Sequence, residues 1–296
     1  MQIEAYRPEM APALAAGYND LVAGLPYCHP VQAEQIAAAA GGDEMDERLH
    51  SDAVFALMQG DAALGMAHVA MESPEEPDAA PRGAIRFLWY ARGHRAAGQA
   101  LLEAAEDHLH AAGARSVIAF HQDYRYPFYH IGHAYLSDRL EHIHALLGMN
   151  GYRRCAGEVY LLWPDYEPPA AGDPPFPVEV QLEWPEGRGH LPGLIVHALV
   201  DGEQVGVCEN LSLGEFTDAA DAQDRFLTKW LGIEEPVQGR GLGRFLLATA
   251  LGELHGAGYR HAVISTSWTN HRACLFYSNF GYRANDWTYA LARDLG

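Results

Sequence analysis

The sequence predicts an α/β chain made of two domains of the same kind in tandem. Stretches of apolar, β-prone residues alternate with stretches of helical composition along the chain. The pattern of the first half returns in the second half, and a proline-rich segment, Pro164–Pro175, lies between the two copies. We therefore expect a first domain over residues 1–165, a linker over 166–177 and a second domain over 178–296. A chain of 296 residues is long enough for two hydrophobic cores.

An internal repeat supports the two-domain prediction. Gly98–Phe120 aligns without a gap with Gly243–Ser265, at an offset of 243 − 98 = 145. Farther on, Gly151–Arg153 matches Gly281–Arg283 at an offset of 281 − 151 = 130, so the first copy carries 145 − 130 = 15 extra residues. The identical pairs of the ungapped stretch are Gly98/Gly243, Leu101/Leu246, Leu102/Leu247, Ala105/Ala250, Leu109/Leu254, His110/His255, Ala112/Ala257, Gly113/Gly258 and Arg115/Arg260.

In the first domain, runs of alternating or continuous apolar residues predict strands, and alanine- and leucine-rich runs predict helices. The turn at Gly60-Asp61 predicts a hairpin. The expected order is strand Ile3–Arg7, helices near Ala11–Ala23 and Val31–Ala40, hairpin strands Val54–Gln59 and Leu64–Met71, strand Ile85–Tyr90, helix 98–112, strand Ser116–Phe120, helix 138–149 and strand Glu158–Leu162.

The second domain repeats this order with one omission. Its first strand runs almost directly into the next, so the two helices that come after the first strand of domain one are missing. A turn at Asp201-Gly202 joins the next two strands. The expected elements are strands Val178–Leu182, Leu194–Val200, Gln204–Cys208 and Leu227–Ile233, a helix through Phe245–Leu251, strand His261–Thr266 and a helix that begins at Asn270.

A glycine-rich loop stands between strand Leu227–Ile233 and the next helix. It reads Gln238-Gly239-Arg240-Gly241-Leu242-Gly243-Arg244. Three glycines let the backbone turn tightly and approach a ligand closely. The free N–H groups of the first helical turn, together with the helix dipole, favour an anion such as a phosphate. The loop fits either a phosphate cradle or an ordinary strand-to-helix turn, and the pattern of residues 261–282 favours the cradle.

At this point the chain resembles the GNAT superfamily, the GCN5-related N-acetyltransferases. Their pyrophosphate loop has the pattern Gln/Arg-x-x-Gly-x-Gly/Ala, which Gln238, Gly241 and Gly243 match. Their next block has an Asn that opens a helix and a Tyr shortly before a Gly-aromatic pair. Asn270, Tyr277, Gly281 and Tyr282 match that block, and the resemblance extends over about residues 225–292. Tandem members of the superfamily are known, and the mycothiol synthases among them use the C-terminal copy for catalysis.

The resemblance implies two tandem GNAT folds, each a mixed, mostly antiparallel sheet flanked by helices. It implies acetyl-CoA as co-substrate and transfer of the acetyl group from the thioester to an amine. The two helices that are missing from the second domain help to form the acceptor side in this fold, so we expect the first domain to shape the acceptor pocket. The cofactor-binding residues that the resemblance implies are Leu231, Gly232, Ile233, Gln238, Gly239, Arg240, Gly241, Leu242, Gly243, Arg244, Asn270 and Tyr277.

Acyl transfer also needs proton transfer. The departing thiolate needs a proton, and the Tyr277 hydroxyl is the expected donor. For the base that deprotonates the amine, Glu209, Glu234 and Asp224 are all candidates, and a water chain is a further possibility. In the mycothiol synthases the base is a Glu on the strand before the loop. Leu227–Ile233 contains no Glu, which argues against the substrate of those enzymes.

The first copy is expected to have lost this chemistry. Ala96 stands in place of Gly241, and Leu147, which has no proton to give, stands in place of Tyr277. Arg92, His94 and Arg95 can hold a phosphate or face solvent, and we favour the second interpretation. In this fold the extra residues, which begin at Asp123–Tyr129, lie near the mouth of the cleft. They either fill the unused pocket with aromatic rings or line a ligand site, and we favour filling.

Composition narrows the function classes. The net charge is −19, with 39 acidic against 20 basic residues, which disfavours a nucleic-acid partner. An acidic surface suits solubility, the interpretation that we favour, and it also raises the local concentration of a cationic amine. No run is long and apolar enough for a membrane span, and the N-terminus has no signal-peptide pattern, so we expect a cytoplasmic protein. No disulfide and no metal site are expected. Histidines cluster at His121, His130, His133, His142 and His144 without an accompanying acidic or cysteine pattern.

Two function classes stay open. The first is an acetyl-CoA-dependent N-acetyltransferase that acts on a small, cationic amine. The second is a non-catalytic acyl-CoA-binding sensor or scaffold. The match at Asn270 and Tyr277 favours the enzyme. The sequence decides neither the amine nor the oligomeric state.

Overall fold

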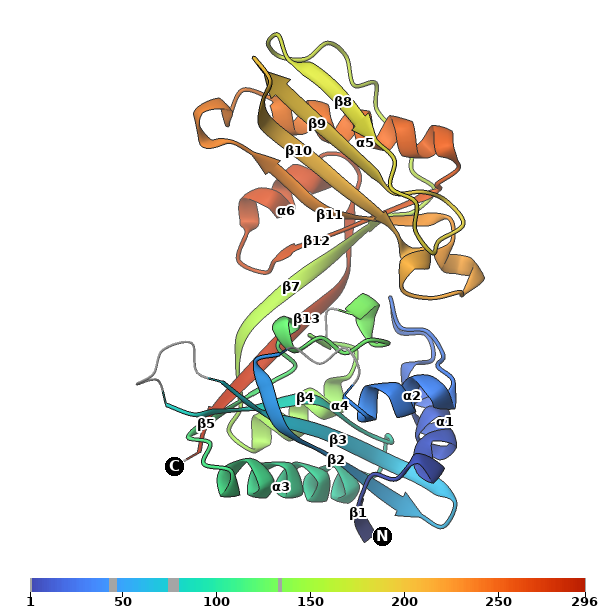
Figure 1. The fold of residues 1–296 in the computed structure, drawn as a ribbon, viewed down its shortest axis with the longest axis vertical. Helices are drawn as coiled ribbons and strands as arrows, with labels where there is room; N and C mark the ends of the chain where they lie inside the picture. The colour runs from blue at the N-terminus through green and yellow to red at the C-terminus, as the bar shows by residue number, and fades with distance from the viewer. Residues whose placement is uncertain (1, 43–46, 74–79, 133–134, 296) are drawn as a thin grey trace. The chain divides into compact units, whose positions relative to one another are not determined.

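The computed structural model describes residues 2–42, 47–73, 80–132 and 135–295. The chain forms two compact units (Figure 1). Unit 1 is Met1–Glu158 together with Asp286–Gly296, and unit 2 is Val159–Asn285. Strands β7 (Arg153–Trp163) and β13 (Arg283–Asp294) each begin in one unit and end in the other. The structure therefore assigns the C-terminal residues to unit 1, whereas the sequence pattern placed them in the second domain.

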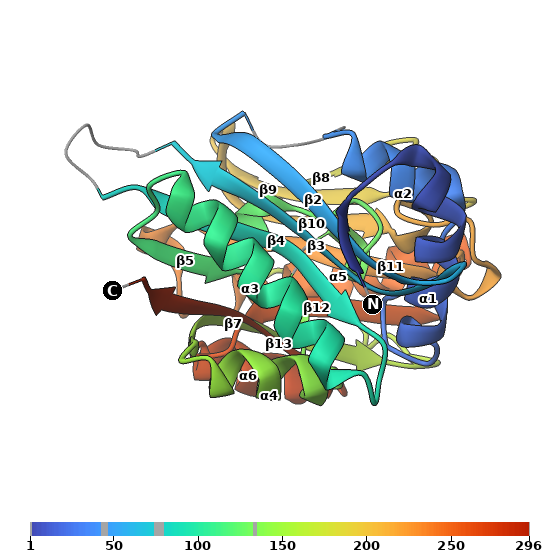
Figure 2. The same cartoon turned by 90° about the horizontal axis from the view of Figure 1, so that it is seen from below.

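Unit 1 contains a sheet in the order β1-β2-β3-β4-β5-β13-β7, in which β4 and β5 are parallel and the other pairs with a described register are antiparallel. Helix α1 packs on β3, and α3 packs on β3 and β4, as Figure 2 shows for α3. The elements are β1 (Gln2–Ala5), α1 (Ala11–Val22), α2 (Ala33–Ala40), β2 (Leu49–Gln59), β3 (Ala62–Glu72), β4 (Arg82–Tyr90), α3 (Arg95–Ala111), β5 (Ser116–Ala119), β6 (Leu136–Ser137) and α4 (Glu141–Met149).

Unit 2 contains a sheet in the order β7-β12-β11-β10-β9-β8, in which β11 and β12 are parallel. Helix α5 packs on β9, β10 and β11 through a leucine-rich face that includes Leu246, Leu247 and Leu251. The elements are β8 (Glu179–Glu183), β9 (Leu194–Val200), β10 (Glu203–Ser212), β11 (Arg225–Ile233), α5 (Leu242–Ala257), β12 (His261–Ser267) and α6 (His271–Ser278).

Both units have the architecture that the resemblance implies, a mixed and mostly antiparallel sheet flanked by helices. Residues 184–193, between β8 and β9, contain no helix, which confirms that unit 2 lacks the helix pair represented in unit 1 by α1 and α2. The role of the first domain in forming the acceptor side stays a prediction. The linker residues fold with unit 2, where Ala171 and Phe176 pack on its hydrophobic core.

Candidate active site

In unit 2 the two parallel strands at the centre of the sheet separate partway along their length. The described pairing of β11 with β12 runs from Arg225–His261 to Thr228–Ile264, and β11 then continues to Ile233. At the point of separation β11 bulges, because Thr228 lies opposite Asn210 while Trp230 lies opposite Glu209. The bulge gives β11 one extra residue, Lys229. Beyond it no pairing of β11 with β12 is described, and Leu231 and Ile233 line a cavity.

The glycine-rich loop comes after β11 and ends at α5. Gly241 is the N-cap of α5 and has φ +95°, a left-handed conformation that favours glycine. Within the described chain no side chain caps this helix. The N–H groups of its first turn therefore point outward without an intrahelical partner, which suits a phosphate. Gln238 Nε2 donates to the carbonyl oxygen of Ile233 at 2.8 Å and so ties the loop to the end of β11.

A cavity of about 450 Å³ lies along the open part of β11 and the loop. Nine of the predicted cofactor-binding residues line it: Leu231, Ile233, Gln238, Gly239, Gly241, Leu242, Gly243, Arg244 and Asn270. Four further lining residues were not predicted: Val237, Arg272, Ala273 and Phe276. Arg272, Ala273 and Phe276 lie on α6, and their approach to the cavity depends on how that helix packs, which no short motif encodes. The structure thus brings the strand, the loop and the start of α6 around one space.

The three other predicted cofactor-binding residues are not among those that line this cavity. A Cβ atom on Gly232 would lie 2.5 Å from Nε1 of Trp230, so glycine makes room for the indole there. The guanidinium of Arg240 lies 4.1 Å from the ring centre of Phe176, in the linker. Tyr277 is 8% exposed and belongs to the hydrophobic core of unit 2.

The buried position of Tyr277 matters for its chemistry. Its ring centre lies 6.0 Å from that of Tyr282 and 5.2 Å from that of Phe276, a residue that lines the cavity. Burial raises the pKa of the Tyr277 hydroxyl, and the neighbouring Cys208 and Cys274 raise it further. The hydroxyl is therefore protonated across the physiological range, and the same shift makes it a weaker acid than an exposed tyrosine.

Asn270 has two roles in its surroundings. It is the N-cap of α6, and its side-chain oxygen accepts a hydrogen bond from the Ala273 N–H at 3.1 Å. Because the oxygen is used in this way, the amide nitrogen of Asn270 is the group that remains for a ligand in the cavity.

The candidate bases lie at different places in unit 2. Glu209 lies directly beside the bulge, and one of its carboxylate oxygens is 3.9 Å from Nζ of Lys229. Glu234 is exposed and comes after the far end of β11, beside the loop. Asp224 precedes β11, and its carboxylate lies 3.6 Å from Nε2 of His261. Of these three residues, only Glu209 therefore lies next to the point at which β11 and β12 separate.

The equivalent loop of unit 1 has a different structure. Helix α3 begins at Arg95, whereas the residue aligned with the first residue of α5 is 242 − 145 = 97, so α3 begins two residues earlier. Ala96, the counterpart of Gly241, is consequently inside the helix. Arg92 forms a salt bridge with Glu141 and donates to the carbonyl oxygen of Arg139 at 2.9 Å. Unit 1 thus lacks the open, glycine-capped loop that precedes the central helix of unit 2.

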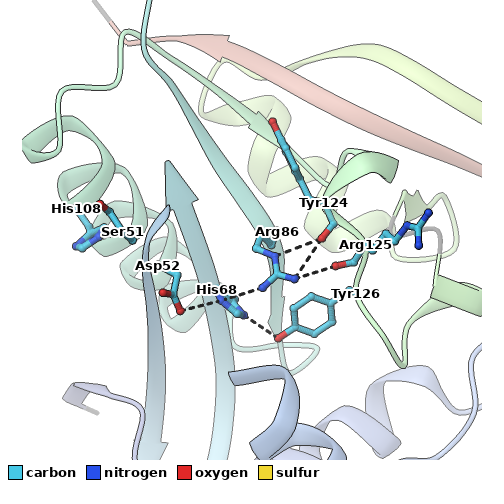
Figure 3. A network of polar contacts seen from close by, with 8 residues as sticks. All are labelled: Ser51, Asp52, His68, Arg86, His108, Tyr124, Arg125 and Tyr126. Carbon is cyan, nitrogen blue, oxygen red and sulfur yellow. Dashed lines mark hydrogen bonds and ion pairs between the residues drawn. The ribbon is translucent and has the colours of Figure 1, made fainter. Parts of the chain in front are cut away.

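The cleft of unit 1 also contains a buried arginine that the sequence pattern did not reveal. The bulge of β4 has the same form as that of β11, because Val69 lies opposite Ile85 while His68 lies opposite Phe87. The extra residue is Arg86, which is completely buried. Its guanidinium donates to the carbonyl oxygens of Tyr124 at 3.3 Å and Arg125 at 3.1 Å (Figure 3). Arg86 is thus the counterpart of Lys229, and it holds the inserted segment.

Aromatic rings of the insertion fill the space around Arg86. Tyr124, Tyr126 and Tyr129 are at most 1% exposed. The ring of Tyr126 stacks on Phe87 with centres 4.4 Å apart, and its hydroxyl lies 3.3 Å from Nδ1 of His68. The rings of the insertion are therefore buried within unit 1, and filling of the unused pocket stays the favoured interpretation.

His68 is neutral in this network. Burial lowers its pKa to about 3, and the charge of Arg86 contributes to the same shift. Nη1 of Arg86 lies 3.2 Å from Nε2 of His68 and donates to it, so the ring proton lies on Nδ1, toward Tyr126. Among the described residues no group of three or more His, Cys, Asp or Glu side chains is arranged to hold a metal. His133 lies outside the described residues.

Comparison with known proteins identifies the fold. Residues 157–282 match the acetyltransferase (GNAT) family model. A tandem GNAT protein from the clavulanic acid biosynthesis pathway is 14% identical, with a TM-score of 0.68 over 100% of this chain and 98% of that one. A GCN5-related N-acetyltransferase from Sphaerobacter thermophilus is 15% identical, with a TM-score of 0.62 over 99% and 95% of the two chains.

A GCN5-related glucosamine N-acetyltransferase region of a fungal multi-domain β-N-acetylglucosaminidase is 14% identical, with a TM-score of 0.67 over 99% of this chain and 38% of that one. No curated protein sequence matches the chain. Within the described residues no helix has the length and apolar character needed to cross a membrane. Residues 157–282 thus match the acetyltransferase (GNAT) family model, and the chain over its whole length has the fold of a tandem GNAT protein, with two GNAT folds in succession.

Proposed function

We propose that this protein is an N-acetyltransferase that moves the acetyl group of acetyl-CoA to a small, cationic amine, and that unit 2 carries the reaction. The observation that carries the proposal is the cavity of unit 2, which joins the open edge of β11 to an uncapped helix N-terminus. A thioester on a long arm with a pyrophosphate fits these two features together. The charge of −19 favours a cationic acceptor over an anionic one.

The reaction requires that the amine nitrogen bonds to the thioester carbonyl carbon and that the C–S bond then breaks. The carbonyl oxygen gains negative charge, and in this proposal backbone N–H groups within Leu231–Ile233 stabilise it; the lining of the cavity by Leu231 and Ile233 supports this role. The sulfur leaves as a thiolate and takes a proton from the Tyr277 hydroxyl. The amine loses a proton to a base, and the products are an N-acetyl amine and free CoA.

Among the candidate bases we propose Glu209. It lies next to the bulge, where the open part of β11 begins. Glu234 lies at the other end, 234 − 228 = 6 residues beyond Thr228, which corresponds to roughly 20 Å along a strand. Since the loop binds the phosphates near Glu234, the acetyl group at the opposite end of the pantetheine arm lies nearer Glu209. Nζ of Lys229, the extra residue of the bulge, lies 3.9 Å from the Glu209 carboxylate.

A non-catalytic acyl-CoA-binding protein is the alternative. The burial of Tyr277 favours it, because this side chain can serve the core alone. A screen of small amines with acetyl-CoA, in which release of free CoA thiol is followed, separates the two functions. We expect thiol release that depends on the amine and disappears in Gly241→Glu. Tight acetyl-CoA binding without thiol release for any amine class would favour the sensor.

A further inference from the structure

The linker between the two repeats packs beside the phosphate loop and leaves a second cavity there. This cavity, of about 150 Å³, lies between linker residues that include Ala170, Asp173 and Pro175 and the residues Arg244 and Ala248 of α5. Gly241 and Arg244 line both this cavity and the larger one. The two spaces therefore adjoin at the loop.

We propose that the linker forms the adenine-binding wall of the acetyl-CoA site and that the small cavity holds the adenine ring. This inference rests on the proposed function of unit 2. A CoA molecule whose pyrophosphate binds the loop extends from it in two directions, with the pantetheine arm on one side and the nucleoside on the other. The larger cavity runs along β11 and takes the arm. The small cavity is the space that adjoins the loop on the side of α5 and the linker.

The lining of the small cavity suits a purine. The proline and alanine side chains and Phe245 offer apolar surface to the faces of the ring. The carboxylate of Asp173 can accept a hydrogen bond from the exocyclic amino group of adenine. Arg244, on the wall that the cavities share, supplies positive charge toward the phosphates.

The linker lies close to the loop at two places. The guanidinium of Arg240 lies over the ring of Phe176 at 4.1 Å, a cation–π contact between the loop and the linker. A Cβ atom built on Gly241 would lie 3.7 Å from Cβ of Pro175, which is ordinary van der Waals contact. The linker is therefore a packed part of the site and not a loose tether.

The test fills the small cavity from the linker side. Ala170 is exposed, so Ala170→Trp can occupy the cavity without disturbing the core. Ala220→Trp, at another exposed alanine of unit 2, is the matched control. By calorimetry we expect Ala170→Trp to weaken the binding of acetyl-CoA and of adenosine 3′,5′-bisphosphate by roughly tenfold or more. The reason is that the indole excludes the adenine ring of the ligand from the cavity, so the buried contacts of that ring are lost. The control should bind both ligands like the wild type.

A second probe tests Asp173. The compound 1,N6-etheno-CoA lacks the amino hydrogens of adenine, so the wild type should bind it several-fold more weakly than CoA. Asp173→Ala should bind the two alike. Equal affinity of the wild type and Ala170→Trp for acetyl-CoA would overturn the proposal, and so would an Asp173→Ala variant that still distinguishes CoA from 1,N6-etheno-CoA. If Gly241→Glu abolishes acetyl-CoA binding in the same experiments, the cofactor site itself is still supported. Failure of the wild type to bind acetyl-CoA would overturn the function itself.

Discussion

The two units begin their central helices in different ways. In unit 2 the left-handed Gly241 ends the loop and α5 starts after it, which exposes the N–H groups of the first turn. In unit 1 the aligned residue is an alanine that lies inside the helix, because α3 begins two residues earlier than α5 does in the alignment. The bulge residues differ in the same direction: Lys229 is exposed, whereas Arg86 is buried against the chain's own carbonyl groups. One unit keeps its cleft open, and the other fills it from within.

A repeat can thus keep the scaffold on which a site is built while the loop and the side chains around it change. The parallel pair ends after four residues in both units, with the bulge directly after it. Those features belong to the backbone and depend on many apolar contacts. The site depends on single residues at the loop and on the side chains that occupy the cleft, and these differ between the units although the scaffold does not.

The largest expected effect comes from the loop. Gly241→Glu should abolish acetyl-CoA binding, because a carboxylate would enter the phosphate site and because φ +95° strains any side chain. The matched change in unit 1, Ala96→Glu, should bind like the wild type. Isothermal titration of both variants checks this difference, and equal losses in the two would break the comparison.

The proton donor is the next position. Tyr277→Phe keeps the ring in the core and removes the hydroxyl, so turnover should fall by roughly 10²-fold or more while acetyl-CoA affinity changes little. Leu147→Ala, at the aligned position of unit 1, should reduce thermal stability and leave turnover per folded molecule unchanged. Steady-state kinetics with an amine from the screen decides the matter. Near-normal turnover of Tyr277→Phe would make this tyrosine a packing residue.

Substitution of the proposed base, Glu209, should lower turnover by a similar or smaller factor. Glu209→Gln should lower turnover by about 10²-fold, since it keeps the shape and cannot take a proton. Glu234→Gln, the control at the other end of β11, should have little effect. A rate at high pH that recovers in Glu209→Gln would support its role, because an amine that is already neutral needs no base. Equal losses in both variants would contradict the assignment.

The filled cleft of unit 1 predicts a modest pH effect on stability. The folded pKa of His68 is about 3, against 6.5 for an ordinary histidine. The unfolded chain therefore binds a proton that the folded chain excludes, and stability falls as the pH drops from about 6.5 toward 3. His68→Gln cannot titrate, so its thermal midpoint should fall less steeply over this window. Parallel curves for variant and wild type would show that His68 is not the source.

Much of the site was predictable because its signals are local. The glycine loop, Asn270 and the open strand could be located from short patterns, and nine of the expected residues line one cavity. The positions of Arg272 and Phe276 could not, because they depend on the packing of α6. The same holds for the burial of Tyr277 and for the contact of Phe176 with Arg240, which joins residues 64 positions apart (240 − 176 = 64).

For the fold, helix and strand order could be predicted from apolar periodicity in both repeats. The inclusion of Asp286–Gly296 in unit 1 could not, since a repeat alignment places the last strand with its own copy. Strand pairing across a long sequence separation is decided by tertiary contacts, such as the pairing of Leu291 with Ala119 in unit 1. The buried pair of His130 and Asp286, with Nε2 and Oδ2 2.9 Å apart, belongs to the same class of contacts.

The central claim is that one of the two repeats binds acetyl-CoA and the other does not. Calorimetric titration of the full-length protein with acetyl-CoA measures this directly through the number of sites per chain. We expect one site, which is retained in Ala96→Glu and lost in Gly241→Glu. Two sites per chain, or one site that survives Gly241→Glu, would contradict the claim.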